Sequence, residues 1–261
     1  TAPTGPANTG VWVRETGTSV LVSENTVSDF SNRGIFLDDN PGMGGGTCTI
    51  SVEENDVSNG GNTAQGIVVD ELNGDGSIFN NTVSLVFRGI TVQSTVLDTE
   101  VNTIDNNVVF LYPGPTVTLD VAYGVGYFSV EEGRIEGNTV RGNCPFAGGF
   151  GPCTTDVAEN RAIRGIQLSL TEDILVKSNE AFTAGAGLYI EGSNVRGNAL
   201  CNVFTDCFAG VVFDDIPTNG FGLPGPALST EVNQTGFSLA HDNAENQWRS
   251  ILIPGLVPLR A

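Results

Sequence analysis

The sequence predicts an all-β solenoid, in which short strands with one buried face stack coil upon coil. Three observations support this fold class: a motif centred on asparagine recurs along the chain, a motif led by glycine alternates with it, and both place apolar residues at alternate positions. Apolar and polar residues that alternate with a period of two are typical of a half-buried strand. A pattern that recurs at varying intervals indicates a repeat protein with loop insertions.

The asparagine motif has an aliphatic residue three positions before the asparagine and an apolar residue two positions after it. Its first copy is Val22-Ser23-Glu24-Asn25-Thr26-Val27. The pattern aligns these asparagines: Asn25, Asn55, Asn81, Asn107, Asn138, Asn179 and Asn198. Stacked coils lie about 4.8 Å apart, so inward-facing amides in one column can donate hydrogen bonds to one another and accept them. The motif therefore predicts an internal asparagine ladder.

The glycine motif places apolar residues at the first and third positions after a glycine, as in Gly34-Ile35-Phe36-Leu37. Its copies begin at Gly10, Gly34, Gly66, Gly89, Gly165, Gly187 and Gly210, with a degenerate copy at Gly126. The alternation predicts a second strand in each coil with its apolar side chains turned inward. Both motifs together predict a parallel β-helix with aliphatic columns in its core.

With these motifs the chain resembles the right-handed parallel β-helix superfamily, which includes pectin-degrading and alginate-modifying enzymes, phage tailspikes and many surface proteins. The resemblance covers roughly residues 9–216 and implies a right-handed solenoid of about eight coils. It implies no single activity, because one fold supports many unrelated functions.

The domain organisation follows from where the pattern holds. An extended lead-in at residues 1–8 precedes one β-helix domain at residues 9–216, with loop insertions at 39–47, 111–123 and 142–160. The pattern decays after Phe213, so residues 217–261 are expected to form a C-terminal cap or a docking segment for a neighbouring subunit. Trp248, Ile251 and Ile253 would provide its apolar contacts.

The charge of the chain excludes some partners. There are 30 acidic and 11 basic residues, for a net charge of −19. This charge disfavours nucleic acid and anionic membranes as partners. The chain has no run of about 18 apolar residues, so no membrane insertion is expected. The acidic residues suit either a hydrated surface or cation binding.

The five cysteines suggest the cellular compartment. Cys144 and Cys153 bracket one short segment and Cys201 and Cys207 bracket another, so we predict two local disulfides. Disulfides indicate an extracellular or cell-surface location. Cys48 is then left over, either buried or available to pair with another chain. The alternative is an intracellular protein with five reduced thiols.

Paired acids follow the glycine-led strand in neighbouring coils, as Asp38 with Asp39 and Asp70 with Glu71. We call these four residues the acidic stripe. Clusters of oxygen ligands suit calcium, and the candidate ligands are Asp39, Asp70, Glu71 and Asp75. The alternative is a hydrated acidic edge without a cofactor.

The acidic stripe is also the candidate catalytic site, because glycoside hydrolysis needs two carboxylates about 5–10 Å apart. The resemblance argues against catalysis. Polygalacturonase-like members carry Asn-Thr-Asp, Asp-Asp, Gly-His-Gly and Arg-Ile-Lys motifs, of which only Asp-Asp is present here, and His241 lies outside the repeats. A polysaccharide-active enzyme (hydrolase, lyase or epimerase) and a non-catalytic glycan-binding module are therefore alternative functions.

Arg33, Arg88 and Arg164 each precede a repeat glycine and so share a register. They are expected to pair with nearby acids, or else to form a column that binds sugars or carboxylates.

Together these features predict a secreted or surface-displayed structural or adhesive protein. Head-to-tail self-assembly through the coil ends is a specific hypothesis. It is motivated by the absence of a capping pattern ahead of Gly10, the apolar C-terminal tail and the odd cysteine. The expected partners are the protein itself, other cell-surface components, or glycans.

Overall fold

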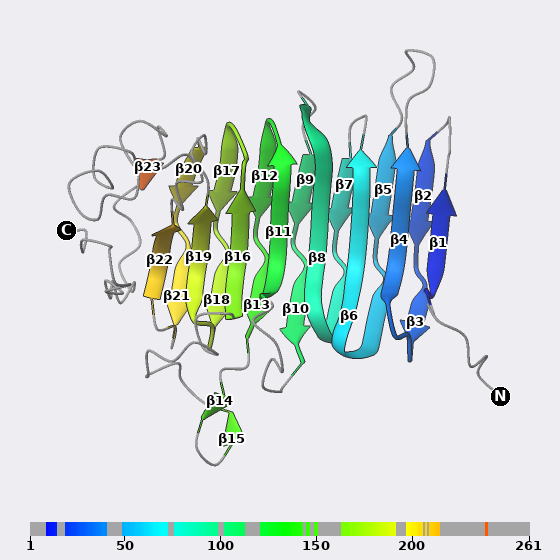
Figure 1. The fold of residues 1–261 in the computed structure, drawn as a ribbon, viewed down its shortest axis with the longest axis horizontal. Helices are drawn as coiled ribbons and strands as arrows, with labels where there is room; N and C mark the ends of the chain where they lie inside the picture. The colour runs from blue at the N-terminus through cyan, green and yellow to red at the C-terminus, as the bar shows by residue number, and fades with distance from the viewer. Residues whose placement is uncertain are drawn as a thin grey trace.

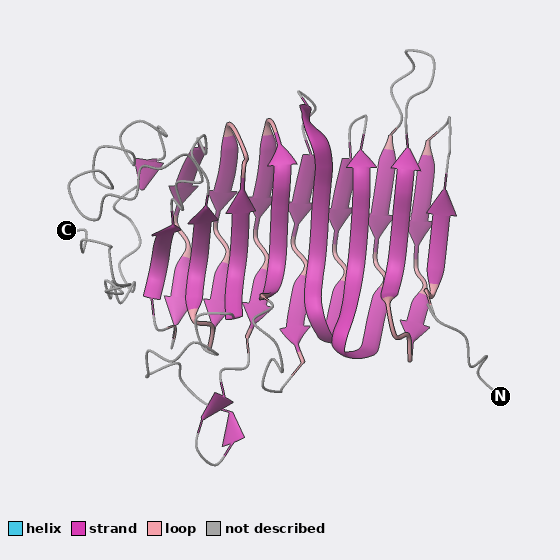
Figure 2. Cartoon of the chain, viewed as in Figure 1, coloured by secondary structure: helices cyan, strands magenta, loops and turns pink. Residues whose placement is uncertain are grey.

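The computed structural model describes residues 9–14, 19–40, 49–72, 76–98, 102–112, 121–142, 145–146, 149–150, 163–191, 197–205, 207, 209–214 and 238–239. Within these ranges the named elements are all strands (Figure 2). They lie side by side along the long axis, from β1 at one end to β22 near the other (Figure 1). Pairing in both main sheets is parallel, as the predicted parallel β-helix requires.

The larger sheet forms two walls of the solenoid. The first wall contains β1 (Val11–Arg14), β4 (Arg33–Asn40), the ends of β6 (Asp56–Leu72) and β8 (Thr82–Asp98), β11 (Ala122–Val130), β16 (Ile163–Ser169), β19 (Ala186–Glu191) and β22 (Ala209–Asp214). The third wall contains β3 (Thr26–Ser28), the beginnings of β6 and β8, β10 (Val108–Leu111), β13 (Thr139–Arg141), β18 (Glu180–Phe182) and β21 (Val203–Thr205).

The smaller sheet forms the second wall. Its strands are β2 (Val20–Ser23), β5 (Ile50–Glu53), β7 (Gly76–Phe79), β9 (Asn102–Asp105), β12 (Gly133–Glu136), β17 (Ile174–Lys177), β20 (Gly197–Leu200) and β23 (Ser238–Leu239). A separate antiparallel hairpin joins β14 (Pro145–Phe146) and β15 (Gly149–Phe150). Each coil passes from the first wall through the second to the third.

Strands β6 and β8 join two coils without a loop. Each begins in the third wall, where Val57 pairs with Val83, and ends in the first wall, where Ile67 pairs with Ile90. The pairing register shifts between Ser58 and Gln65, which marks the bend between the walls. No described residue belongs to a helix long and apolar enough to cross a membrane.

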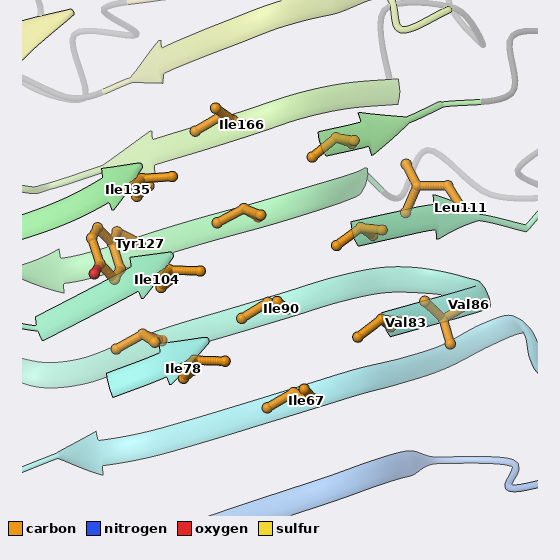
Figure 3. Close-up of a cluster of buried hydrophobic side chains, with 14 of the residues drawn as sticks. Ile67, Ile78, Val83, Val86, Ile90, Ile104, Leu111, Tyr127, Ile135 and Ile166 are labelled. Carbon is orange, nitrogen blue, oxygen red and sulfur yellow. The ribbon is translucent and has the colours of Figure 1, made fainter. Parts of the chain in front are cut away.

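The core consists of stacked inward side chains from all three walls. In the first wall Ile35, Ile67 and Ile90 lie in register and are fully buried. Figure 3 shows such side chains in rows that cross the strands of successive coils, for example Ile67, Ile90 and Ile166. The repeat glycine is needed where the first wall meets the third, because a Cβ atom on Gly34 would lie 2.3 Å from Cγ1 of Val57.

A file of buried asparagines runs along the inside of the turn between the second and third walls. The Nδ2 group of Asn81 donates to Oδ1 of Asn107 at 3.0 Å, and the backbone N–H of Asn81 donates to the same oxygen at 2.9 Å. The same Nδ2 also donates to the carbonyl oxygens of Val52 and Phe79. Equivalent side-chain bonds join Asn25, Asn55, Asn81, Asn107, Asn138, Asn179 and Asn202.

The last predicted position in this file is wrong. Asn198 is exposed on β20, and the ladder position belongs to Asn202. The register is fixed by Ala199, which pairs with Val176, and by Phe204, which pairs with Ala181. The aliphatic position three residues before Asn202 is Ala199. The sequence pattern required a larger aliphatic residue at that position, so it matched Val195 and Asn198, four residues too early.

The degenerate glycine repeat was also misplaced. Gly124 holds the repeat position, because Val125 pairs with Ile90 and Tyr127 pairs with Val92. Tyr127 therefore takes an inward aliphatic position and is fully buried. Gly133 makes room for it, since a Cβ atom there would lie 2.7 Å from the tyrosine ring. The Tyr127 hydroxyl donates to the carbonyl oxygen of Arg134 at 3.1 Å, and burial raises its pKa well above the ordinary value.

The predicted disulfide between Cys201 and Cys207 is wrong, because the two residues are not joined. Cys201 is exposed in a tight turn with a φ of 54°. Cys207 points inward, where its Sγ atom lies 3.6 Å from the carbonyl oxygen of Ala181. One side chain is therefore exposed and the other is buried in the core.

Several predictions fall outside the described residues. These are the Cys144–Cys153 disulfide, the roles of Cys48, Trp248, Ile251 and Ile253, the lead-in at 1–8, most of the three insertions and all of segment 217–261 except β23.

Replacing a central ladder asparagine should destabilise the protein strongly. Asn107→Ala removes three donated bonds and leaves the backbone N–H of Asn81 without its acceptor. We expect a loss of about 3–5 kcal/mol of unfolding free energy, since each orphaned buried group costs about 1–3 kcal/mol. Urea denaturation measures this loss. The control is Asn25→Ala at the end of the ladder, which should cost about 1 kcal/mol. Equal losses in the two variants would contradict the larger contribution that we assign to a central asparagine.

Tyr127→Phe should change how stability depends on pH. The unfolded tyrosine ionises from about pH 10, whereas the folded one keeps its proton because burial raises its pKa. Protons then bind the folded state better, so wild-type stability falls as pH rises above 10. The variant should be about 1 kcal/mol less stable at pH 8, having lost one hydrogen bond. The deficit should shrink by pH 11 in thermal unfolding. A deficit independent of pH would refute this assignment.

Candidate functional site

The outward side chains of the first wall form three rows along the solenoid, which we call the outer face. The first row is Arg33, Gln65, Arg88, Tyr123 and Arg164. The second row is Trp12, Phe36, Val68, Thr91, Gly126, Gln167 and Tyr189. The third row is Arg14, Asp38, Asp70, Gln93, Phe128, Ser169 and Glu191. These rows contain the predicted arginines and part of the acidic stripe.

The structure brings two acids of the stripe together. Asp38 and Asp70 are paired in register on adjacent strands. Asp38 lies 3.9 Å from the Nε atom of Arg14, and Asp70 accepts a hydrogen bond from Nε2 of Gln93 at 2.9 Å. Both carboxylates therefore already have partners on the outer face. The next position in the row is Gln93, so the acids do not continue there.

The remaining residues of the stripe are placed only in part. Asp39 and Glu71 belong to β4 and β6, but their side chains lie outside what the structure describes, and so does Asp75. Among the described side chains, no three His, Cys, Asp or Glu residues are grouped to hold a metal ion. Calcium binding and catalysis by the stripe therefore remain predictions. His241, the one histidine of the chain, is also outside the described ranges.

The predicted arginines share a row, with Gln65 and Tyr123 between them, and each contacts an aromatic ring. Arg33 lies 3.7 Å from the ring centre of Phe36, and Arg164 lies 3.4 Å from that of Tyr189. The Nε atom of Arg88 donates to the carbonyl oxygen of Val121. Such stacking stabilises a guanidinium that is partly removed from water.

Sequence reasoning missed these aromatic partners. The signal was an aromatic residue at the second position after a repeat glycine, in Gly34-Ile35-Phe36 and Gly187-Leu188-Tyr189. That position projects outward, beside the arginine of the same coil or of the preceding one.

A buried polar cluster lies at the β16–β19 end of the outer face. Glu191 accepts hydrogen bonds from NH1 of Arg164 at 3.2 Å and from Nε2 of Gln167 at 3.1 Å. Arg164 and Gln167 are both buried. The charged groups of this cluster contact one another, but the buried Nε of Arg164 and Oε1 of Gln167 have no hydrogen-bond partner among the described residues.

The second wall carries an ion-pair network on its outward side. NH2 of Arg134 lies 2.5 Å from Asp105, and Nζ of Lys177 lies 2.8 Å from Glu136. The hydrogen bond from Lys177 lowers the pKa of Glu136, and the same bond raises the pKa of Lys177. These groups are partly exposed, so their ion pairs contribute little to stability. Each of the four charged groups has an oppositely charged partner.

The first coil, formed by β1, β2 and β3, differs from the coils behind it. Within the described ranges, each of these strands pairs on one side only. Val11, Val13 and Val20 at the end of the core are only partly buried. Trp12 and Leu21 are 57% and 63% exposed, the highest values among the large apolar side chains described. The ring of Trp12 stacks on Phe36, with the ring centres 6.1 Å apart.

The ladder also ends openly at the first coil. Asn25 donates to Asn55, but no described residue donates to Oδ1 of Asn25. At the other end β23 pairs with β20, and Asn202 is only 1% exposed. Within the described residues the two ends of the ladder thus differ, and we call them the open acceptor end, at Asn25, and the covered donor end, at Asn202.

Comparisons with known proteins identify the fold but no function. The family model described as "Right handed beta helix region" matches residues 4–157, more than half of the chain. No curated protein and no solved structure matches the chain.

The Arg164–Glu191 pair should contribute far more to stability than the Arg14–Asp38 pair. The arginine side chain is 9% exposed in the first pair and 57% exposed in the second. Arg164→Gln leaves Glu191 without its cation, which should cost about 2–3 kcal/mol in urea denaturation. Arg14→Gln is the matched variant and should change stability by less than about 1 kcal/mol. Similar losses of unfolding free energy in both variants would show that burial of the arginine does not determine how much its ion pair contributes to stability.

Proposed function

The chain belongs to the right-handed β-helix family, and from that premise we propose that it is an extracellular structural and adhesive protein that binds partners through its first coil. The observation that carries this proposal is the open acceptor end: three strand edges without an outer neighbour among the described residues, beside exposed Trp12 and Leu21. Unpaired strand edges readily accept another strand.

The ladder gives this end a chemical preference. Each asparagine along the file donates its amide and its backbone N–H to the next one. A strand or coil that docks on the first coil would therefore satisfy the open end by donating to Oδ1 of Asn25. Its apolar residues would cover Val11, Val13 and Val20. A partner with its own exposed strand edge, apolar residues and an inward-facing amide side chain would meet both requirements: it would donate to Oδ1 of Asn25 and cover the valines.

Head-to-tail assembly of identical copies is a narrower form of this proposal. It needs the donor end of one copy at the acceptor end of the next. Asn202 at the donor end is buried, and β23 already occupies the edge of β20. Two copies would also repel each other, since each carries a net charge of −19. We therefore favour a different cell-surface protein as the partner. The extracellular location rests on the predicted Cys144–Cys153 disulfide.

A polysaccharide-active enzyme is the second candidate function. The adjacency of Asp38 and Asp70 favours it, since carboxylates on neighbouring strands lie near the separation that glycoside hydrolysis needs. Both carboxylates are engaged by Arg14 and Gln93, so we rank this function second.

The open end can be tested with a peptide that mimics one more coil. Residues 19–40 contain β2 and β3, which form the second and third walls of the first coil, and β4, which belongs to the first wall of the next coil. Their Asn25 donates to Asn55 in the protein itself. Because the coils repeat, a labelled peptide of this sequence should bind the first coil of the intact protein saturably in fluorescence anisotropy. Asn25→Leu in the peptide should weaken binding about fivefold, the effect of one lost hydrogen bond.

Leu21→Asp in the protein should abolish peptide binding, because it places a charge beside the docking edge. The control is Ser77→Asp, which lies in the same row of the second wall away from the open end. Absence of saturable binding, or equal binding to both protein variants, would count against the proposal.

A further inference from the structure

The third wall carries an unusual sequence of outward side chains. Along one row the strands present, in register, Ser28, Ser58, Ser84, Phe110, Arg141, Phe182 and Thr205. Small hydroxyl side chains therefore give way to Phe–Arg–Phe on β10, β13 and β18. This change is not needed to bury the core, because these positions face outward and the inward partners Val109, Val140 and Ala181 already fill it.

Exposed apolar residues gather around Phe110. Phe110 and Tyr112 lie two residues apart on the same side, and they are 38% and 39% exposed. Leu85 is also exposed, and it adopts a φ of 55° at the point where the pairing of β8 with β10 shifts register. The N–H of Tyr112 donates to the carbonyl oxygen of Val86 at 2.7 Å, which fixes the chain there. We call Leu85, Phe110, Tyr112, Arg141 and Phe182 the platform.

Arg141 is the polar centre of the platform. Every other basic residue that the structure describes has an ion-pair, ring or hydrogen-bond partner: Arg14, Arg33, Arg88, Arg134, Arg164 and Lys177. Arg141 is exposed between two phenyl rings and contacts no acid or ring among the described residues. Although the chain has 30 acidic residues, none of those that the structure describes occupies the five N–H donors of Arg141.

We propose that the platform binds a neutral oligosaccharide. Phe110 and Phe182 lie two strands apart, a spacing of about 10 Å, which fits the apolar faces of alternate sugar rings in an extended chain. The guanidinium between them can donate to ring and hydroxyl oxygens. The net charge of −19 repels acidic polysaccharides, which selects a neutral ligand. The platform shares the third wall with β3, but β6 and β8 separate its first strand, β10, from that open edge, so its function does not depend on partner docking there.

Affinity electrophoresis of the full-length protein tests the platform. The gels contain a mixed-linkage β-glucan, a xyloglucan or a galactomannan as neutral probes, and polygalacturonate as the acidic probe. At least one neutral polysaccharide should retard the wild-type protein. Phe110→Ala and Arg141→Gln should each raise its dissociation constant about tenfold, through the loss of a stacking surface or of a charged donor.

The matched controls are Ser58→Ala in the same row and Lys177→Gln, a partly exposed cation on the second wall. Both should bind as the wild type does. Thermal melting checks that each variant is folded, which is expected because Phe110 and Arg141 lie at the surface. Retardation by none of the neutral polysaccharides, retardation by polygalacturonate alone, or unchanged binding in both platform variants would overturn the proposal.

Discussion

The buried asparagine ladder sets the geometry of every coil. The backbone N–H of a ladder asparagine such as Asn81 is satisfied by the amide oxygen of the next coil, and the side-chain Nδ2 donates to that oxygen as well. The residue before each ladder position meets the same bend by adopting a positive φ, as Glu24, Asn80 and Cys201 do. The side-chain bonds span intervals of 23 to 41 residues. The connections can therefore vary in length while the stacking of the walls stays the same.

Much of this architecture could be predicted because its cause is local. The period of two identifies strands, and the recurring asparagine identifies the turn that must close on itself. The prediction failed where a coil departs from the common pattern. Ala199 fills the aliphatic column with a smaller side chain, so Asn202 was overlooked. Tyr127 fills it with a larger one, accommodated by Gly133 from another strand. That compensation is visible only in three dimensions.

The outward surface was harder to predict for a physical reason. At core positions the need to exclude water requires an apolar residue. An outward side chain can contact any of several neighbouring side chains, so its partner does not follow from the repeat pattern. The shared register of Asp38 and Asp70 follows from the repeat. Their engagement by Arg14 and Gln93 depends on which residues flank them in the neighbouring coils. Aromatic partners of the arginines, and the single arginine left between two phenylalanines, likewise come from side chains that no repeat constrains.

The direction of the amide file has a consequence for how such a chain can change length. Duplicating an internal coil would add one asparagine whose side chain both donates and accepts a hydrogen bond in the ladder. All bonds of the ladder would keep the same direction, so its first and last asparagines would be unchanged. Lengthening the solenoid would therefore move the proposed docking end relative to the surface of the other coils, and neither would need a new sequence. A solenoid with such a directional ladder can therefore grow by duplication of internal coils while the ends of its ladder stay unchanged.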